Sequence, residues 1–496
     1  MTHMISSLLL LAPVFAAWLP PAQYFAREYR FHHDNILGTS MELVVRAADF
    51  ETACEAENVA LAEIDRLRRI LSTWDPSSEI SALNRSTGEI ACSAELIDVL
   101  DAYETWRLRT GGAYRCDIGG LLAMWRDAEA RQILPDRRLL RTVAGDAALP
   151  ALHIDREAGR IRRLTAQTLN VDSLGKGYII GRALDAVRLR VSGVSGVLLN
   201  IGGDIGVWGG RPWRIAIADP FRPYDNAPPL ACISLKRGAV GASGSYERPR
   251  TINGQHFSHI IDGRTGWPAG GIVSATVVAS DNASANALAT TLCILPPDEG
   301  LKLARQFGAE CLLVAADGTQ YRSAGFAAME SSPSRRPLGE EGPRNWPAGF
   351  EVVINLTVKP APRRRDYRPY VAVWAEDAEG KPVRTISLWG NETKYLKELP
   401  RWWRIARGRP GLVSAVARAT RPPGRYRIVW DGLDDNNKPV PRGTYRIWVE
   451  SNREKGTLCA GSAVINCGET ESSATIPASA EYEEVQITYG PRGGKK

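Results

Sequence analysis

Residues 256–268 read HFSHIIDGRTGWP, and this stretch is the most informative part of the chain. Two histidines, an aspartate and an arginine surround a Thr-Gly turn that Trp267-Pro268 closes, with two isoleucines between them. Polar groups this dense beside apolar residues are costly to bury unless they serve a purpose. The pattern predicts either a functional turn or a hairpin in which Asp262 and Thr265 only bond the turn backbone.

Six further segments share this mixture of glycine and polar residues. They are NILGTSMEL (35–43), GGAYRCDIGGLLAMW (111–125), LNVDSLGKGY (169–178), LNIGGDIGVWG (199–209), IADP (217–220) and SANALATTL (284–292). In this order they resemble the ApbE family, the FAD:protein FMN transferases or flavinyltransferases. The resemblance runs from about residue 31 to residue 326. It implies an α+β, ApbE-like (T-fold-like) flavin-transferase domain over residues 28–330.

Length and composition predict a soluble protein of two or three domains. A chain of 496 residues exceeds what one hydrophobic core supports, and 44% hydrophobic with 24% charged residues is ordinary for globular proteins. The net charge of +7 permits an acidic partner. We find no zinc spacing, RNA-binding signature or helix-turn-helix pattern, so no nucleic-acid partner is expected.

The N-terminus predicts export. Residues 5–17 form an apolar run too short to span a bilayer, and Val14-Phe15-Ala16 offers a small-residue cleavage site. Residues 1–17 are therefore interpreted as a signal peptide, and a periplasmic or cell-envelope location follows. Because the first residues carry no Lys or Arg, a mis-assigned start or an uncleaved anchor remains an alternative.

Eight cysteines occur without a CxxC pair, which argues against zinc or thioredoxin-type chemistry. Cys459 and Cys467 could bridge neighbouring strands in an oxidising compartment. Cys293 and Cys311 have apolar neighbours and are expected in the core.

Hydrophobic periodicity predicts an α+β domain of mixed order. Helices are expected at residues 51–72, at 93–109 and after Lys176. Strands are expected at 197–201, 213–218, 231–235 and 273–278.

The second half of the chain has a different texture. Residues 331–349 are rich in Pro, Gly and charge, as a linker is. Beyond them, strand-like runs at 370–374, 426–430 and 445–449 alternate with turn signals, which predicts a smaller all-β sandwich of immunoglobulin size over residues 350–496. This segment resembles an uncharacterised periplasmic family that is sometimes fused to ApbE domains.

Two glycine-rich segments are not the common nucleotide motifs. GKGY at 175–178 lacks the upstream glycine and the Ser/Thr of a Walker A loop, and the adjacent Gly202 and Gly203 break the GxGxxG spacing. These loops, with Asp204, can instead bring bare backbone N–H groups to a pyrophosphate, and Lys176 at a helix start supplies charge. The alternative is that the glycines only permit turns.

The resemblance implies FAD as substrate and Mg²⁺ as the ion that neutralises charge during phosphoryl transfer. The metal ligands of the family correspond to Ser173, Asn286 and Thr290. Asn286 stands where the family has an aspartate, so one charge is lost from a site for a hard cation. Asn170 likewise replaces an acidic residue, with Asp172 close enough to compensate.

The resemblance also implies a flavin-binding surface and a proton acceptor. Arg115 replaces a usual aspartate, Trp74 a usual tyrosine, and Gly263 a usual proline. His259 is the candidate for removing a proton from the acceptor hydroxyl, because imidazole titrates in the required range, and Asp262 accompanies it. The residues expected to contact FAD, besides Asn170 and the Lys176, Gly202, Gly203 and Asp204 loops, are Leu37, Trp74, Ala113, Tyr114, Arg115 and Ile260.

Three functions stay open on the sequence alone. The first is transfer of FMN from FAD to a Ser/Thr hydroxyl of an acceptor flavoprotein in the envelope, peripheral to membrane redox proteins, with release of AMP. The second is a non-catalytic flavin-binding or scaffold protein with a degraded metal site. The third is hydrolysis of FAD to FMN and AMP. Self-flavinylation is not expected, because Gly241-Ala242-Ser243 lacks the preceding hydroxyl residue of the acceptor motif.

Overall fold

The structure is a computed structural model of the chain. It describes residues 26–222, 229–245, 250–331, 345–347, 349–360, 368–390, 396–409, 417–418, 420–421, 423–436, 438–453 and 456–491. The predicted signal peptide lies outside these residues, as does most of the predicted linker.

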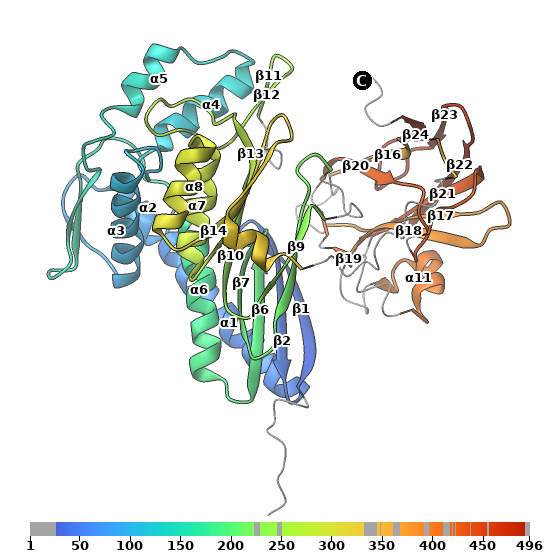
Figure 1. The fold of residues 1–496 in the computed structure, drawn as a ribbon, viewed down its shortest axis with the longest axis horizontal. Coiled ribbons are helices and arrows are strands. Elements are labelled where there is room, and N and C mark those ends of the chain that lie inside the picture. The colour runs from blue at the N-terminus through green and yellow to red at the C-terminus, as the bar shows by residue number, and fades with distance from the viewer. Residues whose placement is uncertain are drawn as a thin grey trace, which may run out of the picture.

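An eight-stranded antiparallel sheet forms the frame of the N-terminal unit (Figure 1). Its strands follow the order β1-β2-β6-β7-β10-β13-β14-β15. The bounds are β1 (Arg27–Ile36), β2 (Thr39–Ala47), β6 (Val194–Ile201), β7 (Asp204–Gly209), β10 (Gly238–Gly244), β13 (Ile272–Ala279), β14 (Glu310–Ala315) and β15 (Gln320–Arg322).

Helices cover one face of this sheet and bury the larger core (Figure 1). Side chains alternate across a strand, so Leu43 and Val45 of β2 face the helices while Val44 faces the other way. The helices on this side are α1 (Phe50–Leu71), α2 (Glu79–Arg85), α3 (Ala94–Arg109), α6 (Asp172–Arg190), α7 (Asn282–Ile294) and α8 (Pro297–Gln306).

The opposite face is covered by a hairpin and a short helix, which makes the unit three layers thick. Trp213, Ile215 and Ile233 of the hairpin pack with Phe326 of the helix over Val44 of the sheet. These elements are β8 (Trp213–Ile217), β9 (Ala231–Leu235) and α9 (Ala324–Met329).

Two small sheets and two helices extend the helical side. The turn at residues 258–268 follows one of these sheets and packs on the two helices. Trp267 of the turn contacts Trp125 of the first helix. The elements are β3 (Ile90–Ala91), β4 (Leu152–Asp155), β5 (Arg160–Arg163), β11 (Arg250–Ile252), β12 (Gln255–Phe257), α4 (Gly119–Arg131) and α5 (Arg137–Ala144).

The C-terminal unit is built from two sheets that enclose an aromatic core containing Trp346, Trp389 and Trp430. One sheet has the order β20-β16-β24-β23 and the other β19-β18-β17-β21-β22. The bounds are β16 (Phe350–Val358), β17 (Tyr370–Glu376), β18 (Pro382–Trp389), α11 (Pro400–Ala406), β19 (Ala417–Arg418), β20 (Gly424–Trp430), β21 (Gly443–Asn452), β22 (Cys459–Cys467), β23 (Ser472–Ile476) and β24 (Val485–Pro491).

The predicted fold class is confirmed, and so are the helices and strands named above, with two corrections. The helix near Lys176 begins at Asp172, so Lys176 lies in its second turn and not at its start. Cys459 and Cys467 lie at opposite ends of the single strand β22 and are free thiols. Eight residues of strand span about 26 Å, far beyond the reach of a disulfide. Cys293 and Cys311 are buried, as expected.

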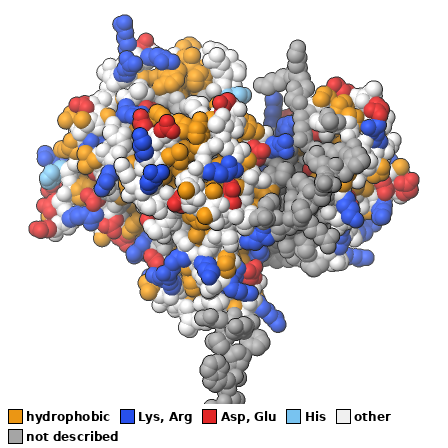
Figure 2. Space-filling view, in the orientation of Figure 1, with side chains coloured by type: hydrophobic (Ala, Val, Ile, Leu, Met, Phe, Trp, Pro, Cys, Tyr) orange, Lys and Arg blue, Asp and Glu red, His pale blue; other side chains and the backbone are white. Residues whose placement is uncertain are grey.

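The surface charges and the hydropathy of the helices give no further indication of function. Charged side chains of both signs are interspersed over the visible face of the N-terminal unit (Figure 2). Within the described part of the chain, no helix combines the length and apolar content needed to cross a bilayer.

Candidate active site

Two helices from distant parts of the chain meet where the metal ligands were expected. Asn286 of α7 donates from Nδ2 to the carbonyl oxygen of Ser173 in the first turn of α6, at 3.0 Å. Asn286 is only 4% exposed, and among the described residues its Oδ1 has no hydrogen-bond partner. Thr290 follows four residues later on the same side of α7, with its hydroxyl 3.3 Å from that of Ser243.

Glycines, which have no side chain, permit α7 to approach α6 and the sheet closely. A Cβ on Gly177 of α6 would lie 2.3 Å from the carbonyl oxygen of Asn282, and one on Gly241 of β10 would lie 2.4 Å from that of Ala285. Asp281 caps α7 by accepting from the Ser284 N–H at 2.8 Å, and the alanines that follow favour the helix. The backbone of α7 is therefore held directly against both α6 and the sheet.

Two tyrosines hold the hydroxyl of Ser173. The Tyr114 hydroxyl lies 2.6 Å and the Tyr103 hydroxyl 3.1 Å from Ser173 Oγ, and the two rings stack at 5.2 Å. Burial raises the pKa of Tyr103 to about 12 and that of Tyr114 well above its ordinary value. Both phenols are therefore protonated at neutral pH. Tyr114, expected to line the flavin, is here a buried partner of Ser173.

Lys176 pairs with a buried carboxylate. Its ammonium contacts Asp204 at the start of β7, and Asp204 also accepts from the Ala242 N–H at 3.1 Å. The lysine side chain remains 26% exposed, whereas that of Asp204 is 3% exposed. Asp204 thus holds Lys176 in place while part of the lysine side chain stays exposed.

The glycine turns at the end of the sheet do not present bare amides. Gly202 donates its N–H to Ser40 at 3.0 Å, and Gly203 donates to the side chain of Asn200 at 3.0 Å. The first of these bonds brings the β6–β7 turn beside the β1–β2 turn, where Leu37 adopts a positive φ of 49°. The expectation that these N–H groups are free to meet a pyrophosphate is therefore wrong for the structure described.

The turn at residues 262–266 is built around Asp262. Its backbone carbonyl accepts from the Gly266 N–H at 2.8 Å, and its carboxylate holds Arg264 through two nitrogens, at 2.9 and 2.8 Å. His259, half-buried, and the buried Ile260 precede this turn. Asp262 therefore acts on the site by shaping the turn, with its carboxylate already paired.

Arg115 forms an ion pair that was not predicted from the sequence. Its guanidinium bonds both carboxylate oxygens of Asp117 at 2.5 Å, and both side chains are buried. A Cβ on Gly263 would lie 2.8 Å from the Arg115 side chain, and the Gly263 N–H donates to Ala113 at 3.0 Å. A proline at 263 could not make that bond. The two unusual residues, Arg115 and Gly263, thus fit each other.

Trp74 is the open aromatic of the site. It is 77% exposed, and its neighbour Thr73 donates to Asp172 at 2.7 Å. Asn170 donates to the other oxygen of Asp172 at 3.0 Å, and its own N–H reaches the Cys116 carbonyl at 2.7 Å. An exposed indole beside the first turn of α6 can stack on a planar ring.

Of the residues expected from the sequence, Tyr114 and Asn286 contact Ser173 at the first turn of α6, and Lys176 pairs with Asp204 one turn later. His259, Ile260 and Asp262 belong to the separate turn at residues 258–268, and Leu37, Gly202 and Gly203 to the turns at the end of the sheet. Tyr103, Asp117 and Ser243, which contact Ser173, Arg115 and Thr290, were not predicted. Only the Arg115-x-Asp117 spacing offered a signal, because residues two apart in an extended segment point the same way.

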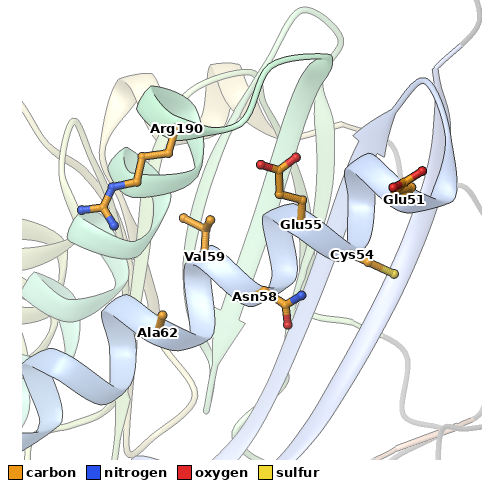
Figure 3. A pocket seen from close by; sticks show the side chains of 7 residues that line it. All are labelled: Glu51, Cys54, Glu55, Asn58, Val59, Ala62 and Arg190. Carbon is orange, nitrogen blue, oxygen red and sulfur yellow. The ribbon is translucent and has the colours of Figure 1, made fainter.

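A surface hollow on α1 lies away from these residues. Six residues of α1 and Arg190 at the end of α6 line it, and none is a candidate site residue (Figure 3). Among the described residues, no group of three or more His, Cys, Asp or Glu side chains is placed to hold a metal.

Comparison with known proteins decides the family. The ApbE family model matches residues 37–313. The chain belongs to the ApbE family. A second model, described as a predicted periplasmic protein (DUF2271), matches residues 351–484. The fusion expected from the sequence is thereby confirmed.

Curated relatives of this ApbE-family chain carry the name FAD:protein FMN transferase. One from Rhodobacter capsulatus is 29% identical over 331 residues, which cover 64% of this chain and 60% of that protein. One from Escherichia coli K12 is 24% identical over 315 residues, covering 61% of this chain and 89% of that protein.

Solved structures agree on the fold. The ApbE protein from Thermotoga maritima superposes with a TM-score of 0.56 at 25% identity, over 62% of this chain and all of that one. The apo flavinyl transferase ApbE from Pseudomonas stutzeri gives 0.51 at 20% identity, over 62% of this chain and 98% of that one.

Proposed function

We propose that this protein is an FAD:protein FMN transferase of the periplasm or cell envelope. The P–O bond between the two phosphates of FAD breaks, AMP leaves, and a new P–O bond forms to a Ser/Thr hydroxyl of an acceptor flavoprotein. The observation that carries the proposal is the cluster over the first two turns of α6, where Ser173 and Lys176 of α6 meet Asn286 of α7 and Asp204 of β7.

The residues present are compatible with Mg²⁺ as the cofactor. Asn286 offers a buried oxygen that has no hydrogen-bond partner among the described residues. Ser173 and Thr290 add hydroxyl oxygens, which also contact Tyr114 and Ser243. Magnesium binds oxygen ligands, although it favours carboxylates. When bound, the ion would neutralise charge on the pyrophosphate.

The remaining roles fall to the chain itself. Lys176, oriented by Asp204, supplies a positive charge to a phosphate. Trp74 stacks on a ring of FAD, and His259 accepts the proton of the acceptor hydroxyl. Asp262 keeps His259 in place by holding the turn that follows it.

Purified full-length protein incubated with FAD and Mg²⁺ tests the proposal. The probe is a purified acceptor protein that carries a Ser-Gly-Ala-Thr-type sequence, and both AMP release and protein-bound flavin are measured. The proposal expects AMP only when the acceptor is present. AMP and free FMN without acceptor would indicate hydrolysis, and FAD binding without AMP would indicate a scaffold. Failure to bind FAD at roughly tens of micromolar would overturn all three.

A matched pair of histidine variants tests the site. His259→Ala should bind FAD but transfer FMN roughly a hundredfold more slowly, which is the usual contribution of a positioned base. His256→Ala is the control, because His256 is exposed and its ring contacts Thr251 at 3.0 Å. Equal loss in both variants would remove His259 from the mechanism.

A further inference from the structure

The bond between Asn286 and Ser173 joins two helices whose backbones already touch. Gly177, one turn after Ser173, meets the carbonyl of Asn282, and Asn286 lies one turn after Asn282. Both contacts therefore line the same seam between α6 and α7. The hydrogen bond connects residues 113 positions apart, so it fixes tertiary structure and not only local geometry.

The chemistry of an amide decides what this bond can do. A carboxamide offers a donor and an acceptor, whereas an ionised carboxylate only accepts. A carboxylate in this position would face the Ser173 carbonyl oxygen at about the 3.0 Å that the amide nitrogen now keeps. Two acceptors repel each other at that distance unless a cation lies between them, and burial makes an unpaired charge expensive.

We propose that Asn286 is a positioning residue that locks the first turn of α6 to α7 without a metal ion, so that the site is assembled before any cation binds. The Nδ2–H supplies the positive end of the link, and Oδ1 stays available as a neutral ligand. Because a neutral amide binds Mg²⁺ weakly, the cation then adds little stability to the folded state. The part that concerns Mg²⁺ rests on the proposed function, whereas the locking role does not.

Asn286→Asp is the direct test, with thermal unfolding measured in EDTA and again in excess Mg²⁺. The wild-type unfolding temperature should change little between the two conditions. The variant should unfold several degrees lower in EDTA, because it buries a charge against a carbonyl, and should regain most of that loss with Mg²⁺. Its Mg²⁺ affinity, measured by calorimetry, should exceed the wild-type value by roughly tenfold.

Asn282→Asp is a matched control on the same helix. Asn282 is equally buried, and its Nδ2 also donates to a backbone carbonyl, that of Ile205, at 3.0 Å. This variant should lose stability in EDTA without rescue by Mg²⁺. Equal rescue of both variants would mean that the ion acts non-specifically, and the proposal would fall.

Asn286→Ala covers the case in which the aspartate variant does not fold. Removing the link without adding charge should lower the unfolding temperature in both conditions, with no response to Mg²⁺. An alanine variant as stable as the wild type would show that the bond locks nothing. A wild-type protein that loses several degrees in EDTA would show that a metal, and not Asn286, holds the seam.

These thermal measurements use neither FAD nor an acceptor. A protein that fails to release AMP can still show the expected pattern, and a transferase can still fail to show it. The two proposals therefore stand or fall separately.

Discussion

The two units of this chain bury polar groups in different ways. In the C-terminal unit, the carboxylate of Glu376 accepts from the indoles of Trp374 and Trp448, at 3.0 and 2.7 Å. Glu450 accepts from two backbone N–H groups at the start of α11. The amide oxygen of Asn452 in this unit has no donor among the described residues, and neither does that of Asn286 in the N-terminal unit. Asn286 differs because it lies on the seam between α6 and α7, among the residues expected to bind FAD and a metal ion.

This difference indicates where a ligand belongs. A buried polar group whose partners come from its own unit serves packing, because each donor and acceptor is already satisfied. A buried oxygen without a donor has a cost that a ligand can offset. An unpaired oxygen occurs in both units, so it is the position of Asn286 among the residues expected to bind FAD and a metal ion that favours ligand binding in the N-terminal unit. Experiment can break this division of roles.

The largest effect is expected from Asp117→Ala. It leaves the buried guanidinium of Arg115 unpaired, which costs about 3–5 kcal/mol of unfolding free energy. Urea denaturation measures this loss, and FAD titration should show weaker binding because residues 113–117 support the turn at 262–266.

A matched ion pair in the other unit is the control for that prediction. Glu481→Ala removes the carboxylate that pairs with Arg453 in an equally buried place. It should destabilise the C-terminal unit and leave FAD affinity unchanged. If it weakened FAD binding as much as Asp117→Ala, the division of roles would be wrong.

A smaller effect is expected from Trp74→Ala. The indole is exposed, so stability should stay within about 0.5 kcal/mol, while lost stacking should weaken FAD binding by about 0.5–1.5 kcal/mol, or roughly two- to tenfold. Fluorescence titration measures the affinity. Leu189→Ala, which is equally exposed, should change neither quantity.

Glu450 gives the C-terminal unit a distinct pH dependence. Burial raises the pKa of Glu450 above 4.5, although the N–H groups of Trp402 and Arg401 oppose the rise. Because the folded-state pKa is raised, the protonated carboxyl favours the folded state. Its contribution to the free energy of unfolding is complete below the unfolded-state pKa and is lost as pH rises through the folded-state pKa. The stability of the wild type relative to Glu450→Gln should therefore fall as pH rises from about 4.5. A pH-independent difference in urea denaturation would contradict this.

The smallest effect is expected from removing the C-terminal unit. Truncation after residue 331 should leave FAD affinity unchanged, because every candidate site residue precedes that point. Trp402 of the C-terminal unit is fully buried there and donates to Thr385 at 3.2 Å, so it is not available to cover a flavin. A truncated protein that keeps its circular dichroism spectrum but loses FAD binding would overturn the boundary.

Local pattern was enough to predict most of the elements. The hydrophobic periodicity of residues 51–72 predicted α1, and the apolar runs predicted β6 and β13, because helix and strand periods are properties of neighbouring residues. The resemblance supplied the family and therefore the region of the site.

Pairings between distant residues could not be read from the sequence. Nothing near Lys176 indicates that Asp204 neutralises it, and nothing near Asn286 indicates that its amide reaches Ser173. The disulfide failed for the same reason, since spacing does not say whether two cysteines share a strand. The bare glycine amides failed because their acceptors, Ser40 and Asn200, depend on how two turns meet.

The meeting of α6 and α7 at Gly177 has a consequence for folding. The two helices are separated by about a hundred residues of chain that must first build the strands between them, and contacts of such long range form slowly. The site therefore exists only once the whole N-terminal unit has closed. A ligand that binds there binds the native state alone, so a tightly bound one must protect all of that unit against unfolding, in proportion to the logarithm of its concentration, whereas a weakly bound cation protects it little.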